Sequence, residues 1–498
     1  MMVATPETLL LLSLVLPVAC ALVLPFLARW PNLREGVTLV TAAALFLVVI
    51  DLYLLMKAGI RPEINVLRIT TGLRLGFESE PLGMVFALIA SSLWIANSIY
   101  SIGYMRSEKE PRQTRFYTAF AIAIAGAIGI AFAGNLFTMF LFYEVMTLST
   151  YPLIIHKRTE EALRAGRIYL LVLLGASLIL FLPAIIGTRV IAGSLEFVPG
   201  GLFAGRADTA ILALLLGMFV FGLAKAALMP LHFWLPAAMV APTPVSALLH
   251  AVAVVKAGVF CIVKIVIYIF GPQTLIETGA STWLIYVAAA SILISSLIAL
   301  SKDNLKARLA YSTISQLSYV VLGAALATTA GLTGAIIQIA AHAFGKITLF
   351  FCAGAIYVVT HKTEISQLDG IGRKMPVTMI AFLLGSLSII GIPPLVGIWS
   401  KWYLAMAAVD TNHYLIMGVL LLSSFLNIAY LLPIVGRAFF LIPKDEKPKR
   451  GKKPPPPPPI IAAPIACLVP LSLTAIGCVV LFFCIDIFRT LAEAALAY

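Results

Sequence analysis

The sequence predicts an all-α membrane protein that crosses the bilayer about 14 times. Hydrophobic residues make up 61% of the chain and charged residues only 11%, whereas an ordinary soluble domain is about 25% charged. Apolar runs of about 20 residues, the length that crosses the hydrocarbon, recur along the chain, and five lysines lie inside them. The composition therefore leaves little surface for water and places several charges at membrane depth.

Each expected span follows from the same length criterion. The spans lie at about 7–28, 36–56, 80–104, 114–132, 135–155, 166–189, 209–230, 243–270, 282–300, 305–326, 331–360, 376–408, 413–440 and 460–486. Two of these helices are expected to be broken, because proline removes a backbone hydrogen bond. Four prolines fall between Pro230 and Pro244, after the seventh helix, and Gly391–Pro394 interrupts the twelfth. Irregular backbone at membrane depth is tolerated only inside protein or beside a wet cavity.

The order of the helices predicts two inverted repeats of five helices each. Residues 111–271 hold helices 4–8, and residues 272–440 hold helices 9–13. Because five is an odd number, the second set must run opposite to the first. Each set has its broken helix in fourth position, with Lys225 or Lys401 near the break, and matched broken helices point to a transport site. The other segments are helices 1–3 in 1–110, a basic and proline-rich loop at 441–459, and a last helix in 460–498.

The positions of Lys and Arg predict the orientation in the membrane. Loops after odd-numbered helices hold 23 of the 35 basic residues, against six in loops after even-numbered helices. Because cytoplasmic loops are the more basic ones, both termini are expected outside, in a bacterial or archaeal cell (inner) membrane. The net charge of +13 is then a topology signal and gives no reason to expect a nucleic-acid partner. The loop 441–459 is either an extended linker or a docking site for a partner.

Seven titratable residues inside the spans are candidates for carrying protons. A lysine at the centre of a membrane helix costs about 2.5–3.5 kcal/mol, so it persists where it faces a protein-lined, hydrated interior. A proton path requires groups that gain and lose protons, such as ammonium, imidazole and carboxylate. The candidates are Glu144, Lys225, His250, Lys256, His342, Lys346 and Lys401.

Glu144 is the carboxylate in the middle of these spans, and Lys225 is its expected partner. Small residues beside Lys225 permit close approach of helices. One interpretation is a switch, in which Lys225 keeps its proton while the pair is closed and releases it when the pair opens. The other is a static ion pair that fixes helix packing. A buried pair stabilises a protein poorly in its own right, which favours the switch.

Two further helices carry candidates near their centres. Lys256 lies about midway along the eighth helix, where a desolvated ammonium releases its proton more readily than one in water. His250, six residues earlier, is either a relay group or a packed histidine bonded to a backbone carbonyl. His342 and Lys346 are four residues apart on the eleventh helix, so they share one face.

Lys401 and Lys264 are expected to have different roles. Lys401 follows the Gly391–Pro394 break, where freed backbone groups imply water, so we expect it to exchange protons with an aqueous half-channel. Trp399 and Trp402 beside it are also compatible with an interfacial anchor. Lys264 lies nearer the outer end of its helix, and we expect its ammonium to reach the interface.

Several long motifs resemble those of one family of membrane proteins. They are Lys225–Pro236, Ala241–His250, Val255–Gly258, Leu309–Tyr319 and Gly391–Leu395. In these motifs the chain is similar to the antiporter-like subunits of respiratory complex I and of Mrp-type cation/proton antiporters, over helices 4 to 13. The resemblance implies a central hydrophilic axis that conducts protons, at the residues matching Glu144, Lys225, Lys256, His342 or Lys346, and Lys401.

Within this family the resemblance favours the D subunit of Mrp-type antiporters. The lysine at position 401 differs from the carboxylate of the middle antiporter-like subunit of complex I, and the added helices of the larger subunits are lacking. It implies a proton-translocating subunit of a multi-subunit antiporter for a monovalent cation such as Na⁺, with the other subunits and the bilayer as partners. The alternative is a proton-pumping membrane subunit of complex I or of a membrane-bound hydrogenase-type redox complex. An inert scaffold of the same fold is a third possibility.

No motif of soluble-enzyme chemistry appears in the chain. It contains no nucleotide-binding glycine loop, no Cys-x-x-Cys ligand set and no nucleophile elbow. We therefore expect neither a cofactor nor a metal site, and no catalysis by the chain alone. In a redox complex it would be one part of a translocase.

Overall fold

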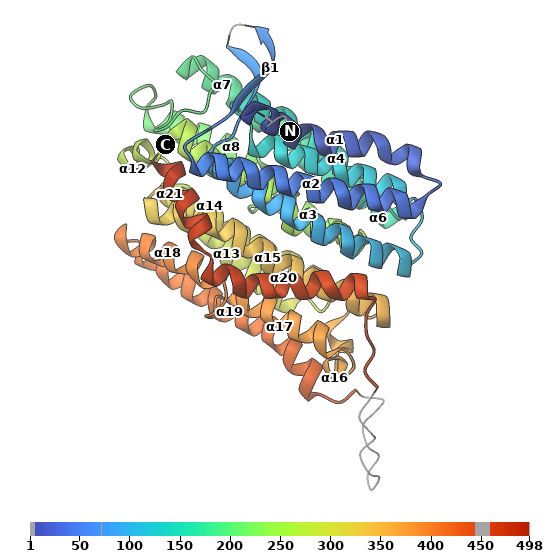
Figure 1. Cartoon of the computed structure of the whole chain (residues 1–498). Coiled ribbons are helices and arrows are strands. Elements are labelled where there is room, and N and C mark those ends of the chain that lie inside the picture. Colours follow the sequence, from blue (N-terminus) through green and yellow to red (C-terminus); the bar gives the residue numbers. More distant parts are fainter. Residues whose placement is uncertain (1–4, 71, 444–458, 498) are drawn as a thin grey trace.

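The computed structural model describes residues 5–70, 72–443 and 459–497. Long helices lie side by side in one bundle, with a β-hairpin at one end (Figure 1). Within the described residues, 12 helices are long and apolar enough to span a membrane. The predicted all-α, multi-pass membrane fold is therefore confirmed. Residues 444–458 of the basic and proline-rich loop lie outside the described residues.

The first eight expected helices are all present. Helices 1–3 are α1 (Pro6–Val23, with the turn η1, Leu24–Leu27), α2 (Pro31–Lys57) and α3 (Pro81–Ser107). Helices 4–7 are α4 (Gln113–Ala131), α5 (Leu136–Ile154), α6 and α7 (Glu160–Ala176 and Leu182–Ala192, joined by η2, Ser177–Phe181), and α8 (Thr209–Gly222). Helix 8 is the run α10 (Thr243–Ala247), η5 (Leu248–Val252), α11 (Val254–Ile265) and η6 (Val266–Phe270). The short elements η3 (Ala224–Ala226), α9 (Trp234–Ala237) and η4 (Ala238–Val240) connect α8 to α10.

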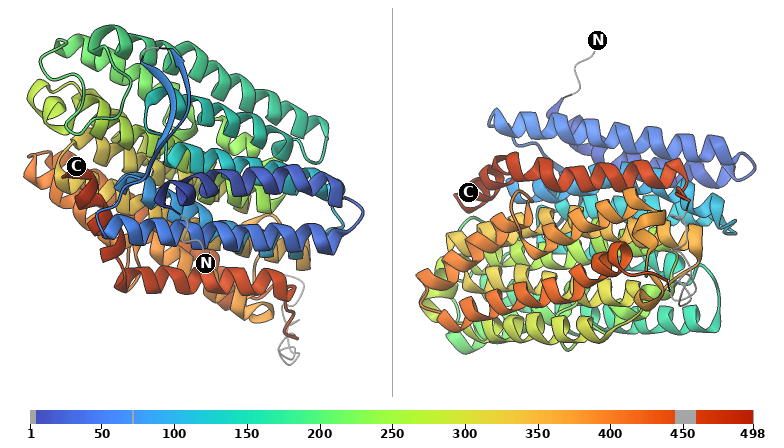
Figure 2. Two further views of the ribbon diagram at one scale, coloured as in Figure 1. Left: turned by 45° about the horizontal axis from the view of Figure 1, so that its top comes forward. Right: turned by 90° about the horizontal axis from the view of Figure 1, so that it is seen from below.

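The remaining helices complete the bundle. They are α13 (Thr282–Ser301), α14 (Leu305–Leu326), α15 (Thr329–Thr360), α17 (Pro376–Ile390), α18 (Gly397–Asp410), α19 (Tyr414–Phe440) and α20 (Ile465–Phe483). Three short elements also occur in this part of the chain. α12 (Pro272–Thr278) precedes α13, and η7 (Ile365–Gln367) and α16 (Ile371–Lys374) lie between α15 and α17. α21 (Asp486–Leu496) follows α20. Figure 2 shows α1, α2 and α20 along one side of the bundle. The segment Thr243–Phe270 is buried over its whole length, so it lies in the interior.

Both predicted helix breaks are present. α8 stops at Gly222, and the chain passes through a left-handed residue at Ala227 (φ +53°) before the proline-rich segment. α17 stops before Gly391 (φ +88°), and α18 begins at Gly397. The two interrupted helices account for the difference between the 12 continuous spans and the 14 expected. Each stands fourth in its set of five, and the inverted relation of the two sets stays a prediction.

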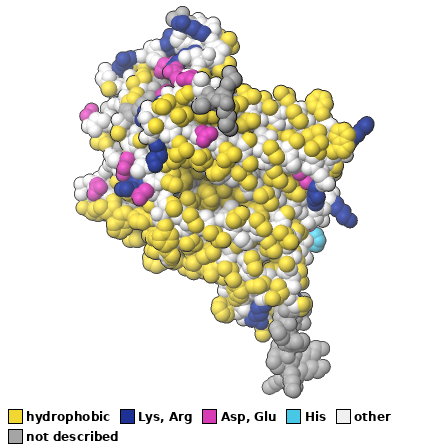
Figure 3. Space-filling model, in the orientation of Figure 1, with side chains coloured by type: hydrophobic (Ala, Val, Ile, Leu, Met, Phe, Trp, Pro, Cys, Tyr) yellow, Lys and Arg dark blue, Asp and Glu magenta, His cyan; other side chains and the backbone are white. Residues whose placement is uncertain are grey.

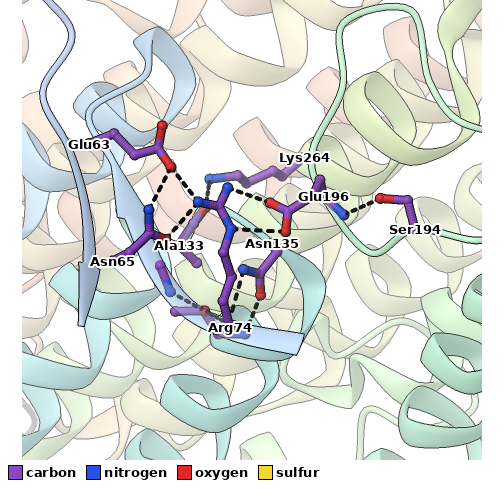
Figure 4. A network of polar contacts seen from close by, with 10 residues as sticks. Glu63, Asn65, Arg74, Ala133, Asn135, Ser194, Glu196 and Lys264 are labelled. Atoms are coloured by element: carbon purple, nitrogen blue, oxygen red, sulfur yellow. Dashed lines mark hydrogen bonds and ion pairs between the residues drawn. The ribbon is translucent and has the colours of Figure 1, made fainter. Parts of the chain in front are cut away.

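The structure adds two elements that were not predicted, the β-hairpin and α21. β1 (Glu63–Thr70) and β2 (Leu73–Glu78) pair antiparallel between α2 and α3. A two-stranded hairpin is marginal by itself, and here Arg74 anchors it. Figure 4 shows the Arg74 guanidinium between Glu63 (2.5 Å) and Glu196 (2.8 Å), while Asn135 Nδ2 donates to the Arg74 carbonyl at 3.1 Å. These tertiary contacts cannot be read from local sequence.

The surface has the distribution expected in a bilayer. Figure 3 shows hydrophobic side chains across the middle of the molecule, whereas charged side chains gather toward its two ends. The start of α1 and the end of α21 lie toward the same end of the bundle as the hairpin (Figure 1). An even number of crossings is consistent with termini on one side.

Candidate functional site

One face of α15 carries the polar centre of the bundle. Gln338, His342 and Lys346 follow one another at four-residue spacing, and Phe350 continues the row. Residues four apart on a helix lie on the same face, and the row rises about 18 Å along the axis. The three polar side chains are buried. The members of the row contact α11, α14, α18 and η5.

His342 is in direct contact with Lys256 of α11. Lys256 Nζ lies 2.5 Å from His342 Nδ1, and both residues are buried (0% and 1% exposed). His342 Nε2 has no hydrogen-bond partner. Two groups that each gain and lose protons therefore share one hydrogen bond inside the bundle.

Lys346 opens a series of hydroxyl contacts. Its Nζ donates to Ser312 Oγ at 2.5 Å and to the Leu309 carbonyl at 3.3 Å. Tyr430 OH lies 2.8 Å from Ser312 Oγ and 2.5 Å from Asn427 Oδ1. A hydroxyl can accept and donate at the same time, so this series is able to pass a proton to or from Lys346.

His250 packs at the end of the α15 row. It lies on the π-helical turn η5, and its ring centroid is 4.7 Å from that of Phe350. Both ring nitrogens are buried without a hydrogen-bond partner. His250 is therefore packed, but the backbone-carbonyl bond of that interpretation is not found within the described residues. Its relay role stays a prediction.

Lys225 and Glu144 lie close together but do not pair. Lys225 Nζ donates to the Tyr143 carbonyl at 2.9 Å and to Thr147 Oγ1 at 2.6 Å, and it lies 3.0 Å from the Tyr143 ring centroid. Both Glu144 oxygens are buried and have no hydrogen-bond partner within the described part of the chain. The predicted ion pair is not formed, because α5 presents Tyr143 and Thr147, one turn apart, to the broken helix. Glu144 is rotated by about 100° from Tyr143.

Gly258 brings Lys225 close to the Lys256–His342 contact. A Cβ atom at position 258 would lie 2.2 Å from the Ala226 nitrogen and 2.4 Å from the Lys225 carbonyl carbon. Only glycine permits the broken helix to approach α11 so closely. Since Gly258 is two residues from Lys256, the two lysines lie on adjoining elements.

Lys401 is directed into the second helix break. Its Nζ donates to the carbonyl of Ile390, the last residue of α17, at 2.7 Å and to Ser424 Oγ at 3.0 Å. Trp402 is 58% exposed, whereas Trp399 Nε1 donates to the Phe482 carbonyl. The ammonium thus satisfies a carbonyl freed by the break, which does not fit an interfacial anchor.

The expectation that Lys264 reaches the membrane interface is wrong. Its side chain is fully buried, and its Nζ lies 3.1 Å from Glu80 Oε1. Figure 4 shows Lys264 beside Arg74, with its ammonium directed to the Ala133 carbonyl at 2.8 Å. Glu80 is a second buried carboxylate, placed by its role as N-cap of α3. Tyr268 OH also donates to it.

Removal of this pair should affect assembly more than transport. In Lys264→Ala, Glu80 would be left buried without its cation, and breaking a buried pair costs about 3–5 kcal/mol. We expect little assembled protein, whereas the double variant Lys264→Met/Glu80→Gln should recover much of it. Abundance and thermal stability of the purified protein measure this. If the single variant is as stable as wild type, the pair has no structural role. Transport per assembled molecule should stay near wild type in both variants.

Comparison with known proteins places these residues in a family. Residues 133–427, more than half of the chain, match the family model described as NADH:quinone oxidoreductase/Mrp antiporter, TM. The chain belongs to this family. It is 32% identical to NADH-quinone oxidoreductase subunit N of Desulforudis audaxviator, over 81% of this chain and 80% of that protein. It is 30% identical to the D subunit of the Na(+)/H(+) antiporter of Alkalihalophilus pseudofirmus, over 74% of this chain and 76% of that protein.

Solved structures of two other proteins contain chains with the same fold as this family member. The Mrp complex of a Dietzia species contains a chain that superposes with a TM-score of 0.85 at 23% identity, covering 99% of this chain and 97% of that chain. An archaeal membrane-bound sulfane sulfur reductase gives 0.83 at 22% identity. Some relatives are longer: the match covers 57% of NAD(P)H-quinone oxidoreductase subunit 5 from Paulinella chromatophora. Those relatives are named as subunits or chains of larger assemblies.

Sequence reasoning missed the neutral polar residues that bind the titratable groups or one another in this family member. They are Tyr143, Thr147, Ser312, Gln316, Gln338, Ser400 and Tyr430. Spacing was the signal that could have found several of them. Gln338 stands four residues before His342, and Gln316 stands four residues after Ser312.

Proposed function

We propose that this chain is the proton-translocating subunit of a multi-subunit monovalent cation (Na⁺)/proton antiporter. The observation that carries the proposal is the buried Lys256–His342 contact. It lies in one row with Lys346, and a lysine at each helix break flanks it. Such a row has little value for stability, because each buried charge is costly. Proton exchange across the membrane would give this row of buried groups a function.

The open arrangement of Glu144 and Lys225 supports a switch. Glu144 has no partner for either oxygen, and Lys225 is held by neutral oxygen atoms of Tyr143 and Thr147. A small rotation or shift of α5 would bring the carboxylate toward the ammonium. Closing the pair would favour protonated Lys225, and opening it would favour release toward Lys256.

A cavity at the basic end supports access from the cytoplasm. It has a volume of about 160 Å³, and its lining includes Lys157, Lys306, Lys362 and Thr243. Thr243 begins the helical run that carries His250 two turns further on. The Lys- and Arg-rich loops lie at this end, so it faces the cytoplasm, and both termini lie outside the cell membrane.

A second candidate function is proton pumping in a redox complex. It is favoured by the match to NADH-quinone oxidoreductase subunit N, which covers four fifths of both proteins. The two functions share the proton row and differ in their partners. Chains that co-purify with the native protein distinguish them: small antiporter subunits favour the first, and quinone, flavin or nickel–iron subunits favour the second.

The proposed antiport should need the complex. In inverted vesicles the complete complex is expected to move protons when a Na⁺ or K⁺ gradient is applied, detected with a pH-sensitive dye. The purified single chain in liposomes is expected to show little exchange, because we propose that the cation passes through the partner subunits. Robust cation/proton exchange by the single chain would contradict this assignment. No cation-driven proton movement by the complex would contradict antiport itself.

A further inference from the structure

The row on α15 reaches Lys401 through a link of a different chemical kind. Gln338 Nε2 donates to Gln316 Oε1 of α14 at 2.8 Å, and Ser400 Oγ of α18 donates to Gln338 Oε1 at 2.5 Å. The three side chains are at most 3% exposed. Ser400 immediately precedes Lys401 in the chain. The three residues therefore lie between the central titratable groups and the terminal lysine.

The position of this link follows from helix geometry. Gln338 is one turn from His342 on α15, and Gln316 is one turn from Ser312, the partner of Lys346, on α14. The third helix, α18, lies close to α15: a Cβ atom at Gly334 of α15 would lie 3.1 Å from the Ser400 carbonyl oxygen. α18 is thus packed closely against α15 where the link is made.

Amides and hydroxyls behave differently as proton carriers. A hydroxyl accepts one hydrogen bond while donating another, but a carboxamide accepts only at oxygen and donates only at nitrogen. Carboxamides are also not among the side chains that act as general acids or bases. On the Ser312 and Tyr430 side of Lys346 the first two contacts are hydroxyls, and the series ends at the carboxamide of Asn427. On the Lys401 side a proton would have to cross an amide.

One atom of the link lacks a partner. Gln316 Nε2 is buried and makes no hydrogen bond to any residue that the structure describes, and a buried donor without an acceptor is unfavourable. The amide pair is therefore only partly satisfied in this arrangement. α18 is separated from α17 by the Gly391–Val396 break, so a small movement of α18 would part Ser400 from Gln338.

We propose that Gln316, Gln338 and Ser400 form an amide latch that insulates Lys346 from Lys401 until α18 moves. The latch prevents protons from running down their gradient without cation exchange. This proposal rests on the proposed proton path, and it assigns the three residues a positioning and insulating role. Opening the latch would admit water between α15 and α18 and connect the two lysines.

The test replaces the amide by a group that titrates. Gln338→Glu keeps the shape and adds an acid–base group, so the assembled complex should collapse an imposed pH gradient at least roughly tenfold faster in the absence of any cation gradient. Gln316→Glu tests the other amide in the same way. Gln338→Met removes the hydrogen bonds but fills the same space with an apolar side chain that neither titrates nor admits water, so it should not leak. Asn97→Asp, a buried amide outside the latch, is the matched control and should not leak either.

The outcomes separate the latch from the proposed function. A leak in either Glu variant, with tight Met and Asp variants, supports the latch, because a structural role alone gives lower abundance and no leak. Both Glu variants tight at wild-type abundance would overturn the latch. A leak of equal size in Asn97→Asp would also overturn it, by showing that any buried carboxylate suffices. Cation-driven proton movement by the wild type is measured separately and decides the proposed function.

Discussion

Lys225→Ala in the assembled complex should reduce cation-coupled proton movement by at least roughly 100-fold, the loss expected when a positioned proton-transfer group is removed. Lys225 is fully buried on η3, and its ammonium binds Tyr143 and Thr147 of α5. Removing an ammonium from a buried site also removes its desolvation cost, so assembly should be largely intact. Vesicle assays normalised to complex abundance measure the effect. Lys57→Ala, an exposed lysine at the end of α2, should behave as wild type.

The same assay applied to Glu144→Ala tests the switch. Glu144 makes no hydrogen bond in this arrangement, so its loss should leave the fold unchanged. Transport should nevertheless fall to the level of Lys225→Ala, because the closed state of the pair would be missing. Retained transport in a properly assembled Glu144→Ala complex would refute the switch and leave Glu144 as a group without function.

Lys401→Ala should also abolish transport. Lys401 is the last titratable group of the proposed proton path, and it satisfies the Ile390 carbonyl that the helix break frees. A wild-type rate in Lys401→Ala would show that the second break is not on the proton path. The comparison with Lys264 is informative, since both lysines lie at membrane depth. Lys264 is paired with Glu80, so its loss should lower abundance and not the rate per complex.

The fold was largely predictable because membrane spans depend on local composition. Length and hydropathy located every spanning helix, and proline and glycine marked both breaks. The hairpin was missed because its stability comes from Arg74 binding Glu63 and Glu196, which are distant along the chain. α21 was missed because an 11-residue helix falls below the length of a span.

The candidate site was predictable in its titratable residues and not in its contacts. A lysine or histidine in an apolar helix stands out by its cost, so the sequence marks Lys256 and His342, and the structure brings them together. Pairing between helices depends on helix rotation, which composition does not report. The sequence therefore could not show that Glu144 and Lys225 stand apart in this arrangement. Lys264 was assigned to the interface because its partner Glu80 lies in another segment.

The most direct test of the account is the rate of proton movement by the complex carrying Lys401→Arg. Arginine keeps the positive charge but does not release its proton in proteins. Proton transfer at position 401 requires a group that titrates, so the Arg variant should assemble and yet be as inactive as Lys401→Ala. Cation-driven proton movement at the wild-type rate in Lys401→Arg would mean that a fixed charge suffices. That result would contradict proton transfer through the row.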